Sequence, residues 1–184
     1  MAARAVPATL AQLPNALTVF RFALIPLFVA MALADDRSGS WATAAVFALA
    51  AATDQVDGWL ARRWRVESEF GRFADPLADR LMIDAAVVLL WLDGRLPWPS
   101  LAVIAARDGA LLLAYPAVRG RGYEFEVNFL GKLATWVLYA SLVGVLASDR
   151  GTAWPLSLFW AGLALALAAA GAYAAKAWRE VRAR

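Results

Sequence analysis

Long apolar stretches, separated by short polar ones, run along almost the whole chain. A helix needs about 20 apolar residues to cross the hydrocarbon core of a bilayer. Six stretches approach that length, at residues 15–34, 41–60, 76–92, 97–118, 129–147 and 154–178. The pattern predicts an all-α integral membrane protein with six transmembrane helices, in a single domain over residues 1–184.

The composition agrees with a membrane protein and narrows the possible chemistry. Of the 184 residues, 62% are hydrophobic, and the mean hydropathy of +0.57 is too high for an ordinary soluble domain. The chain has no cysteine and no histidine, which excludes disulfides, thiolate zinc sites and imidazole catalysis. Acid and base chemistry must therefore come from carboxylates.

The basic residues gather on one side of the predicted spans, in short loops and the tail, and the net charge is +3. The other side has only Arg37, Arg95 and Arg150, each close to an aspartate in the sequence. Because lysine and arginine are enriched in cytoplasmic loops, both termini and the loop after the second segment are predicted to be cytoplasmic. The charge favours an anionic membrane surface as a partner and not nucleic acid.

The stretch 54–79, DQVDGWLARRWRVESEFGRFADPLAD, places four carboxylates in or beside two apolar segments. Asp54 and Asp57 are three residues apart, so on a helix they share one face. Asp75 and Asp79, four apart, do the same on the next helix. Mg²⁺ and Mn²⁺ prefer carboxylate ligands, and two such ions commonly assist displacement at phosphorus. The stretch therefore predicts a site for Mg²⁺ or Mn²⁺, with two ions.

Two further residues of this stretch fit a ligand that carries phosphate. Gly58 removes a side chain where a bulky ligand could approach the backbone, and Arg62 could hold a phosphate. The residues alone leave two other interpretations open. Intramembrane acids also form ion-pair networks in structural membrane subunits, and they line the cation pathways of transporters.

The spacing of the fixed residues in 54–79 resembles the signature of the CDP-alcohol phosphatidyltransferase family, D-x2-D-G-x2-A-R-x8-G-x3-D-x3-D. The matching residues are Asp54, Asp57, Gly58, Ala61, Arg62, Gly71, Asp75 and Asp79, which fill every fixed position. The resemblance implies transfer of a phosphatidyl group from CDP-diacylglycerol to a hydroxyl, with release of CMP. It also implies a homodimer in the bacterial cell membrane, whose six helices surround a polar cavity that faces the cytoplasm.

The resemblance also implies roles for individual residues. The metal-binding residues are Asp54, Asp57, Asp75 and Asp79. Asp79 is in addition the general base that takes the proton of the acceptor hydroxyl. The positions that match contacts with the CDP-lipid are Asn15, Thr18, Gly58, Arg62, Ser68 and Gly71. For Asn15 and Thr18, in the turn PNALT, helix capping also explains the residue types without a ligand.

The identity of the acceptor depends on residues outside the motif. Phosphatidylglycerophosphate synthases of the family carry a second lysine in a GKxKT pattern, whereas the run GKLAT keeps only Lys132. The surrounding segment, together with ARD at 106–108, resembles the actinobacterial cardiolipin synthases of the family. We therefore predict that Arg107 and Lys132 bind the acceptor, and that phosphatidylglycerol is favoured over a polyol phosphate such as glycerol 3-phosphate. A single lysine near the interface also fits a capping role.

Charged groups inside the predicted spans need a partner or a polar cavity. They are Arg21, Arg80, Arg107, Lys132, Asp84 and Asp108. For Arg80, Asp84 and Asp108, buried pairing is the favoured explanation. Arg107 and Lys132 fit pairing and acceptor binding alike, because both lie toward the cytoplasmic halves of their segments.

Two residue types carry further predictions about packing and membrane position. Small residues dominate the last segment, AGLALALAAAGAYAA, which predicts close helix packing without identifying the partner helix. Tryptophans stand near the ends of several segments and are predicted to anchor them at the membrane interface. They include Trp41, Trp98, Trp154 and Trp178.

Overall fold

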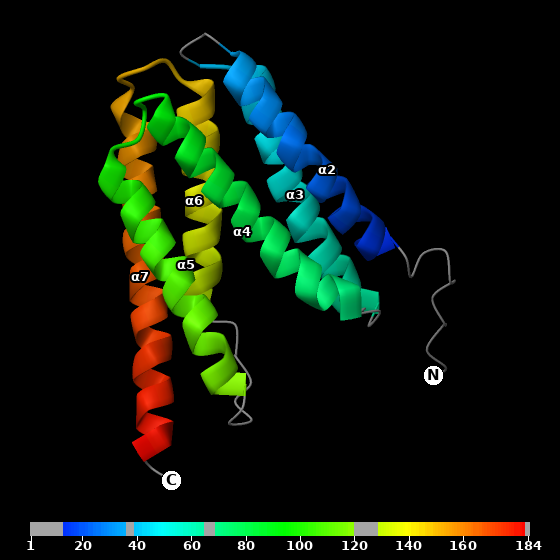
Figure 1. Ribbon diagram of the computed structural model, residues 1–184, viewed down its shortest axis with the longest axis vertical. Helices are drawn as coiled ribbons and strands as arrows, with labels where there is room; N and C mark the ends of the chain where they lie inside the picture. Colours follow the sequence, from blue (N-terminus) through cyan, green and yellow to red (C-terminus); the bar gives the residue numbers. More distant parts are fainter. Residues whose placement is uncertain (1–12, 36–38, 65–68, 120–128, 183–184) are drawn as a thin grey trace.

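Helices make up the part of the chain that the computed structural model describes, residues 13–35, 39–64, 69–119 and 129–182 (Figure 1). Only the backbone course is described at residues 14, 61–62, 69–77, 79, 110–119, 173–174 and 176–182. The helices are α2 (Leu13–Ala34), α3 (Trp41–Trp64), α4 (Glu69–Leu92), α5 (Trp98–Arg119), α6 (Phe129–Ala147) and α7 (Ala153–Arg182). The all-α prediction is confirmed for these residues.

Two pairs of helices are joined by a diagonal one (Figure 1). Helix α2 packs along α3, and α6 packs along α7. Helix α4 crosses between the pairs and contacts α2, α3 and α6, while α5 lies against α4 and α7. The connections α2–α3, α4–α5 and α6–α7 lie at one end of the bundle. The start of α2, the end of α3 and the starts of α4 and α6 lie at the other.

Aromatic side chains fill the core where α2, α3 and α6 meet. The ring centroids of Phe28 and Phe47 are 5.4 Å apart, and those of Phe47 and Tyr139 are 5.7 Å apart. All three residues are buried, and tilted ring pairs at this spacing add to the free energy gained from burial. This cluster fixes the position of α2 and α3 against the second pair of helices.

Helices α6 and α7 approach closely at Gly162. A Cβ atom on this residue would lie 3.1 Å from the backbone nitrogen of Leu138 and 3.0 Å from Cγ1 of Val137. Glycine therefore permits the backbone of α7 to lie against α6. The close packing predicted for the last segment is confirmed at this point, and the partner is α6 of the same chain.

The end of the bundle with the three connections is held by backbone contacts. The backbone N–H of Ser40 donates to the carbonyl of Leu146 over 2.8 Å, which ties the start of α3 to the end of α6. Gly39 precedes it with φ of +117°, and a Cβ atom there would lie 2.7 Å from the carbonyl oxygen of Ser148. A residue with a side chain would be strained by both features.

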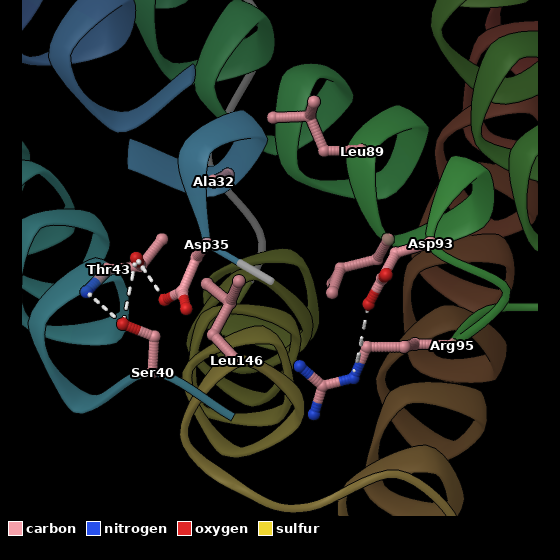
Figure 2. A pocket seen from close by; sticks show the side chains of 9 residues that line it. Ala32, Asp35, Ser40, Thr43, Leu89, Asp93, Arg95 and Leu146 are labelled. Carbon is pink, nitrogen blue, oxygen red and sulfur yellow. Dashed lines mark hydrogen bonds and ion pairs between the residues drawn. The ribbon is translucent and has the colours of Figure 1, made fainter. Parts of the chain in front are cut away.

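Arg95, in the α4–α5 connection, completes this end of the bundle. Its guanidinium donates to the backbone carbonyls of Val145 and Ser148 at the end of α6 and lies 3.9 Å from Asp93. Asp93 also pairs with Arg150. A cavity of about 40 Å³ beside Arg95 is lined in part by Asp35, as Figure 2 shows. Arg95 and Arg150, which stand near aspartates in the sequence, thus both lie near Asp93 in the structure.

Within the described residues, three helices are long and apolar enough to cross a membrane. The candidate spans are Asn15–Ala34, Phe129–Ala147 and Ala153–Ala172. Helices α3, α4 and α5 have 24, 24 and 22 residues, so at 1.5 Å per residue they are about 33–36 Å long. Their length is sufficient, but charged side chains interrupt their apolar sequence. The prediction of six spans is therefore supported for three helices, and for the other three it stays a prediction.

Three of the exposed tryptophans lie at one end of the molecule. Trp41, Trp98 and Trp154 are 77%, 69% and 58% exposed. They stand at or next to the first residues of α3, α5 and α7, which all begin at the end with the three connections. Their position agrees with interfacial anchoring. Trp178 belongs to the residues whose side chains lie outside the described part.

The helices around the acidic stretch are longer than the hydropathy pattern predicts. Helix α3 continues to Trp64, beyond the predicted 41–60, and α4 begins at Glu69 instead of residue 76. The apolar segments therefore end before the helices do, because helical hydrogen bonding continues into polar residues outside an apolar segment. Gly71 lies within α4, and so does Asp75, as its four-residue spacing from Asp79 on one helix requires.

Candidate functional site

The predicted site residues on three helices lie at the same end of the bundle, where α2 begins, α3 ends and α4 begins (Figure 1). On α2 and α3 they are Asn15, Thr18, Asp54, Asp57, Gly58 and Arg62, and on α4 they are Gly71, Asp75 and Asp79. Helix packing between α2, α3 and α4 brings these three segments together. The arrangement agrees with a common site.

Two carboxylates of α3 face into the bundle, as their spacing predicts. The side chain of Asp57 is 1% exposed and that of Asp54 is 18% exposed. Asp57 therefore lies in the interior and Asp54 nearer its edge. A buried ionised carboxylate is costly unless it is paired and hydrogen-bonded, so this face of α3 needs a cation.

Arg21 of α2 is the cation that these carboxylates meet. Its guanidinium nitrogen Nη1 lies 2.7 Å from Oδ1 of Asp54, and Nη2 donates to Oδ2 of Asp57 over 2.5 Å. The Arg21 side chain is 0% exposed. The sequence indicated that Arg21 needs a partner, because it stands inside an apolar segment. Neither carboxylate had been predicted as that partner.

Thr18 and Asn15 lie on the same side of α2 as Arg21. Thr18 precedes Arg21 by three residues, so the two side chains share a helix face, and both are buried. Asn15 stands three residues earlier and is half-buried. The two predicted CDP-lipid contacts of α2 therefore continue the face that carries Arg21 toward the end of the bundle.

The described donors of the predicted metal site fit a divalent cation. Asp54 and Asp57 each direct an oxygen at one positively charged group, so α3 already brings both carboxylates to a common point. Carboxylate oxygens are the ligands that Mg²⁺ and Mn²⁺ prefer. Among the side chains that the structure describes, no group of three or more acidic residues lies close enough together to hold a metal ion.

Several predicted residues cannot be followed beyond their backbone. Arg62 lies on α3, and Gly71, Asp75 and Asp79 lie on α4, but their side chains are outside the described part. Ser68 lies outside the described residues altogether. Gly58 follows Asp57 directly on α3 and is half-buried. Helix α4 packs against α2 and α3, so its first turns belong to the same end of the bundle.

The two predicted acceptor residues lie on other helices and differ in environment. Arg107 of α5 is half-buried, and its Nε donates to the carboxylate of Asp108 over 3.0 Å. Lys132 stands in the first turn of α6, is exposed, and forms no ion pair with the described residues.

A second polar group lies where α4 meets α5. Asp84 of α4 interacts with Asp108 of α5, which also pairs with Arg107. Buried pairing was predicted for Asp108 and is confirmed. The arginine that pairs with it is Arg107, the neighbouring residue, for which the sequence had left pairing and acceptor binding open.

Comparison with known proteins agrees with the motif. Residues 11–171 match the family model for CDP-alcohol phosphatidyltransferase. A cardiolipin synthase (CMP-forming) of Streptomyces coelicolor is 41% identical over 79% of this chain and 69% of its own length. The CDP-diacylglycerol–glycerol-3-phosphate 3-phosphatidyltransferase of Bacillus subtilis is 36% identical over 74% of this chain and 75% of its own length.

A plant relative extends further than this chain. The CDP-diacylglycerol–glycerol-3-phosphate 3-phosphatidyltransferase 1 of Arabidopsis thaliana is 36% identical over 91% of this chain, which spans 63% of that protein's length. These relatives share the activity of phosphatidyl transfer from CDP-diacylglycerol and differ in the acceptor their names imply. Together with the apolar helices, the match shows that the chain is an integral membrane protein and belongs to the CDP-alcohol phosphatidyltransferase family.

Proposed function

We propose that the protein transfers the phosphatidyl group of CDP-diacylglycerol to phosphatidylglycerol, which yields cardiolipin and CMP. The choice of acceptor depends on the run GKLAT. It contains Lys132 but not the second lysine that the phosphatidylglycerophosphate synthases of the family have. A free phosphate monoester carries up to two negative charges and needs several cations, whereas the phosphodiester of phosphatidylglycerol carries one. The cardiolipin synthase from Streptomyces, at 41% identity, supports the same acceptor.

The reaction forms one P–O bond and breaks another. The hydroxyl oxygen of the acceptor attacks the phosphorus that bears the diacylglycerol, and the bond from this phosphorus to the oxygen of the CMP leaving group breaks. Asp79 takes the proton of the hydroxyl as general base. When bound, Mg²⁺ or Mn²⁺ neutralises charge on the pyrophosphate and on departing CMP.

The motif residues divide between holding the cations and holding the CDP-lipid. Asp54, Asp57, Asp75 and Asp79 would hold two divalent cations. The residues that would bind the CDP-lipid are Asn15, Thr18, Gly58, Arg62, Ser68 and Gly71. Ser68 lies outside the described residues; for the other residues, the common position at the end of the bundle where α2 begins supports this assignment. Arg62 would act as a phosphate clamp, because its planar guanidinium can make two parallel hydrogen bonds.

The proposal includes a membrane arrangement. All six helices would cross the bacterial cell membrane and surround a polar cavity that opens to the cytoplasm, with both termini on that side. Lipid tails could then stay in the bilayer while the headgroups react. The exposed tryptophans Trp41, Trp98 and Trp154 at the opposite end support a membrane interface at that end. The active form would be a homodimer.

A second acceptor is favoured by other relatives. The Bacillus and Arabidopsis proteins are named for glycerol 3-phosphate as acceptor. With that acceptor the product would be phosphatidylglycerophosphate, and Arg107 and Lys132 would bind the phosphate of glycerol 3-phosphate. A cation transporter that uses the same acids as a pathway is the alternative from another class.

The decisive experiment is CMP release by purified protein in detergent. CDP-diacylglycerol and Mg²⁺ are supplied with phosphatidylglycerol, glycerol 3-phosphate or inositol phosphate in separate reactions, with Asp79→Asn as the inactive variant. Asp93→Asn, at the opposite end of the bundle, is the matched control. We expect release of CMP with phosphatidylglycerol only, lost on addition of EDTA.

Each other outcome changes the proposal in a defined way. CMP release with glycerol 3-phosphate alone would replace the acceptor and keep the transferase. Divalent cation flux into vesicles without CMP release from any acceptor would overturn the transferase in favour of the transporter. Full activity of Asp79→Asn would remove the general base from the proposed mechanism.

A further inference from the structure

Arg21 contacts both described carboxylates of the proposed metal site, and we propose that it is a positioning residue for that site. Arg21 holds Asp54 and Asp57 through one oxygen each, so that the second oxygen of each carboxylate can be directed at a divalent cation. The inference rests on the proposed function, because it requires that Asp54 and Asp57 bind metal. It adds a residue of α2 to a motif that lies entirely on α3 and α4.

The contact brings one oxygen of each carboxylate to the same guanidinium, through a hydrogen bond at Asp57 and an ion pair at Asp54. Nη1 lies 2.7 Å from Oδ1 of Asp54, and Nη2 lies 2.5 Å from Oδ2 of Asp57. Both nitrogens belong to one planar guanidinium, so their separation is constant. A lysine would offer a single nitrogen and could not set the spacing of two carboxylates in this way.

Burial shields Arg21 and Asp57 from water. The Arg21 and Asp57 side chains are 0% and 1% exposed, so neither has room to exchange its partner for water. Asp54 is 18% exposed, and its Oδ2 accepts a hydrogen bond of 3.2 Å from Gln55, its neighbour in the sequence. A cation can therefore approach from the side of Asp54 while Arg21 stays in place.

The charges of the site allow a positioning role of Arg21 to be distinguished from an effect of its positive charge alone. Arg21, Asp54 and Asp57 together carry one negative charge, so a divalent cation needs the further carboxylates of α4. A nearby positive charge by itself weakens the binding of a cation. If Arg21 acted only through its charge, removing that charge would tighten metal binding. If Arg21 acts by positioning, replacing its two guanidinium nitrogens by a single nitrogen weakens metal binding even when the positive charge is kept.

The test is Mn²⁺ binding, followed by electron paramagnetic resonance on the purified full chain in detergent without lipid substrate. Arg21→Lys keeps the positive charge and removes the planar guanidinium with its two contacting nitrogens. Arg95→Lys, at the opposite end of the bundle, is the matched control for the loss of a buried guanidinium. We expect Arg21→Lys to raise the Kd for Mn²⁺ by about tenfold or more, as is common for residues that orient metal ligands. Arg95→Lys should leave this Kd unchanged.

A second readout distinguishes positioning from a general role in folding. The Mg²⁺ concentration that gives half of the maximal CMP release should rise in Arg21→Lys, while the rate at saturating Mg²⁺ recovers. A merely structural role would reduce the amount of active protein and leave the half-saturating concentration unchanged. If Arg21→Lys does not fold, Arg21→Gln takes its place, and tighter or equal Mn²⁺ binding by that variant overturns the proposal.

The outcomes also separate this inference from the proposed function. Wild-type protein that does not bind Mn²⁺ would refute the metal site itself, and the positioning role with it. Equal affinity of wild type and folded Arg21→Lys would refute only the positioning role. In that case Arg21 would serve as a counter-charge between α2 and α3.

Discussion

The guanidinium of Arg21 lies 2.5 Å from a carboxylate oxygen of Asp57, and neither side chain is more than 1% exposed. The pair joins α2 to α3 inside an apolar bundle. Breaking such a pair by removing one member leaves an uncompensated buried charge, whereas replacing the whole group by apolar or neutral residues is often tolerated. The Arg21–Asp57 contact is therefore needed for stability as long as both charges are buried, since each compensates the other.

This relationship predicts the stability of Arg21 variants. In metal-free detergent we expect Arg21→Ala to lower the free energy of unfolding by about 3–5 kcal/mol. Chemical unfolding followed by tryptophan fluorescence measures the change. Combining Arg21→Leu with Asp54→Asn and Asp57→Asn should recover most of the loss. Wild-type stability of Arg21→Ala would contradict an essential ion pair.

Close packing of α6 on α7 predicts a difference between two glycines of α7. Gly162→Leu places a side chain where even a Cβ atom would lie 3.1 Å from the backbone of Leu138, so the helices must separate. Overpacking of this kind costs about 1–3 kcal/mol. A Cβ atom on Gly171 meets nothing within 4 Å among the described residues, so Gly171→Leu is the control. Equal melting temperatures for the two variants in detergent would argue against the α6–α7 contact.

The contacts of Arg95 predict a loss of stability when this residue, at the opposite end of the bundle, is replaced. Its side chain is 7% exposed and donates to two carbonyls at the end of α6. Burial lowers the pKa of Arg95, but an arginine remains protonated at neutral pH. Since hydrogen bonds to charged groups contribute about 1.5–3 kcal/mol each, we expect Arg95→Ala to lower stability by at least that amount.

The control for Arg95 is an exposed arginine of the same network. Arg150 is 57% exposed and pairs with Asp93, and exposed ion pairs contribute about 0–1 kcal/mol. Thermal unfolding in detergent should therefore separate Arg95→Ala clearly from Arg150→Ala. Similar losses would mean that the contacts to the α6 carbonyls contribute little.

Much of the fold could be predicted from hydropathy alone, because apolar segments of membrane length are helical. The six predicted segments correspond in order to α2 through α7. The ends of α3 and α4 could not be predicted, since Trp64 and Glu69 lie beyond the apolar segments. Backbone hydrogen bonding, and not hydropathy, determines how far these helices continue.

The sequence could predict those features of the site that depend on residue spacing within one helix. The three-residue interval between Asp54 and Asp57 is enough to place both on one face of α3, and the structure has them there. Their contact with Arg21 depends on how α2 is rotated and shifted against α3. That arrangement results from packing such as the Phe28–Phe47 contact, which no short motif describes. The sequence could therefore predict that Arg21 needs a partner but not which one.

The exposed position of Lys132 predicts that its removal affects use of the acceptor and not stability. The side chain is exposed on the first turn of α6 and forms no ion pair with the described residues. Removing it leaves no buried charge, so Lys132→Ala should change stability by less than about 0.5 kcal/mol.

If Lys132 binds the phosphate of the acceptor, its loss removes a charge-assisted hydrogen bond of about 1.5–3 kcal/mol. Because 1.4 kcal/mol corresponds to a factor of ten, kcat/KM for the acceptor should fall by about ten- to a hundredfold. The KM for CDP-diacylglycerol should stay close to its wild-type value. Initial rates of CMP release, with each substrate varied at saturating concentration of the other, measure both. Lys132→Arg, which keeps the charge, should retain most of the acceptor activity, and equal losses for the two substrates would exclude the acceptor role of Lys132.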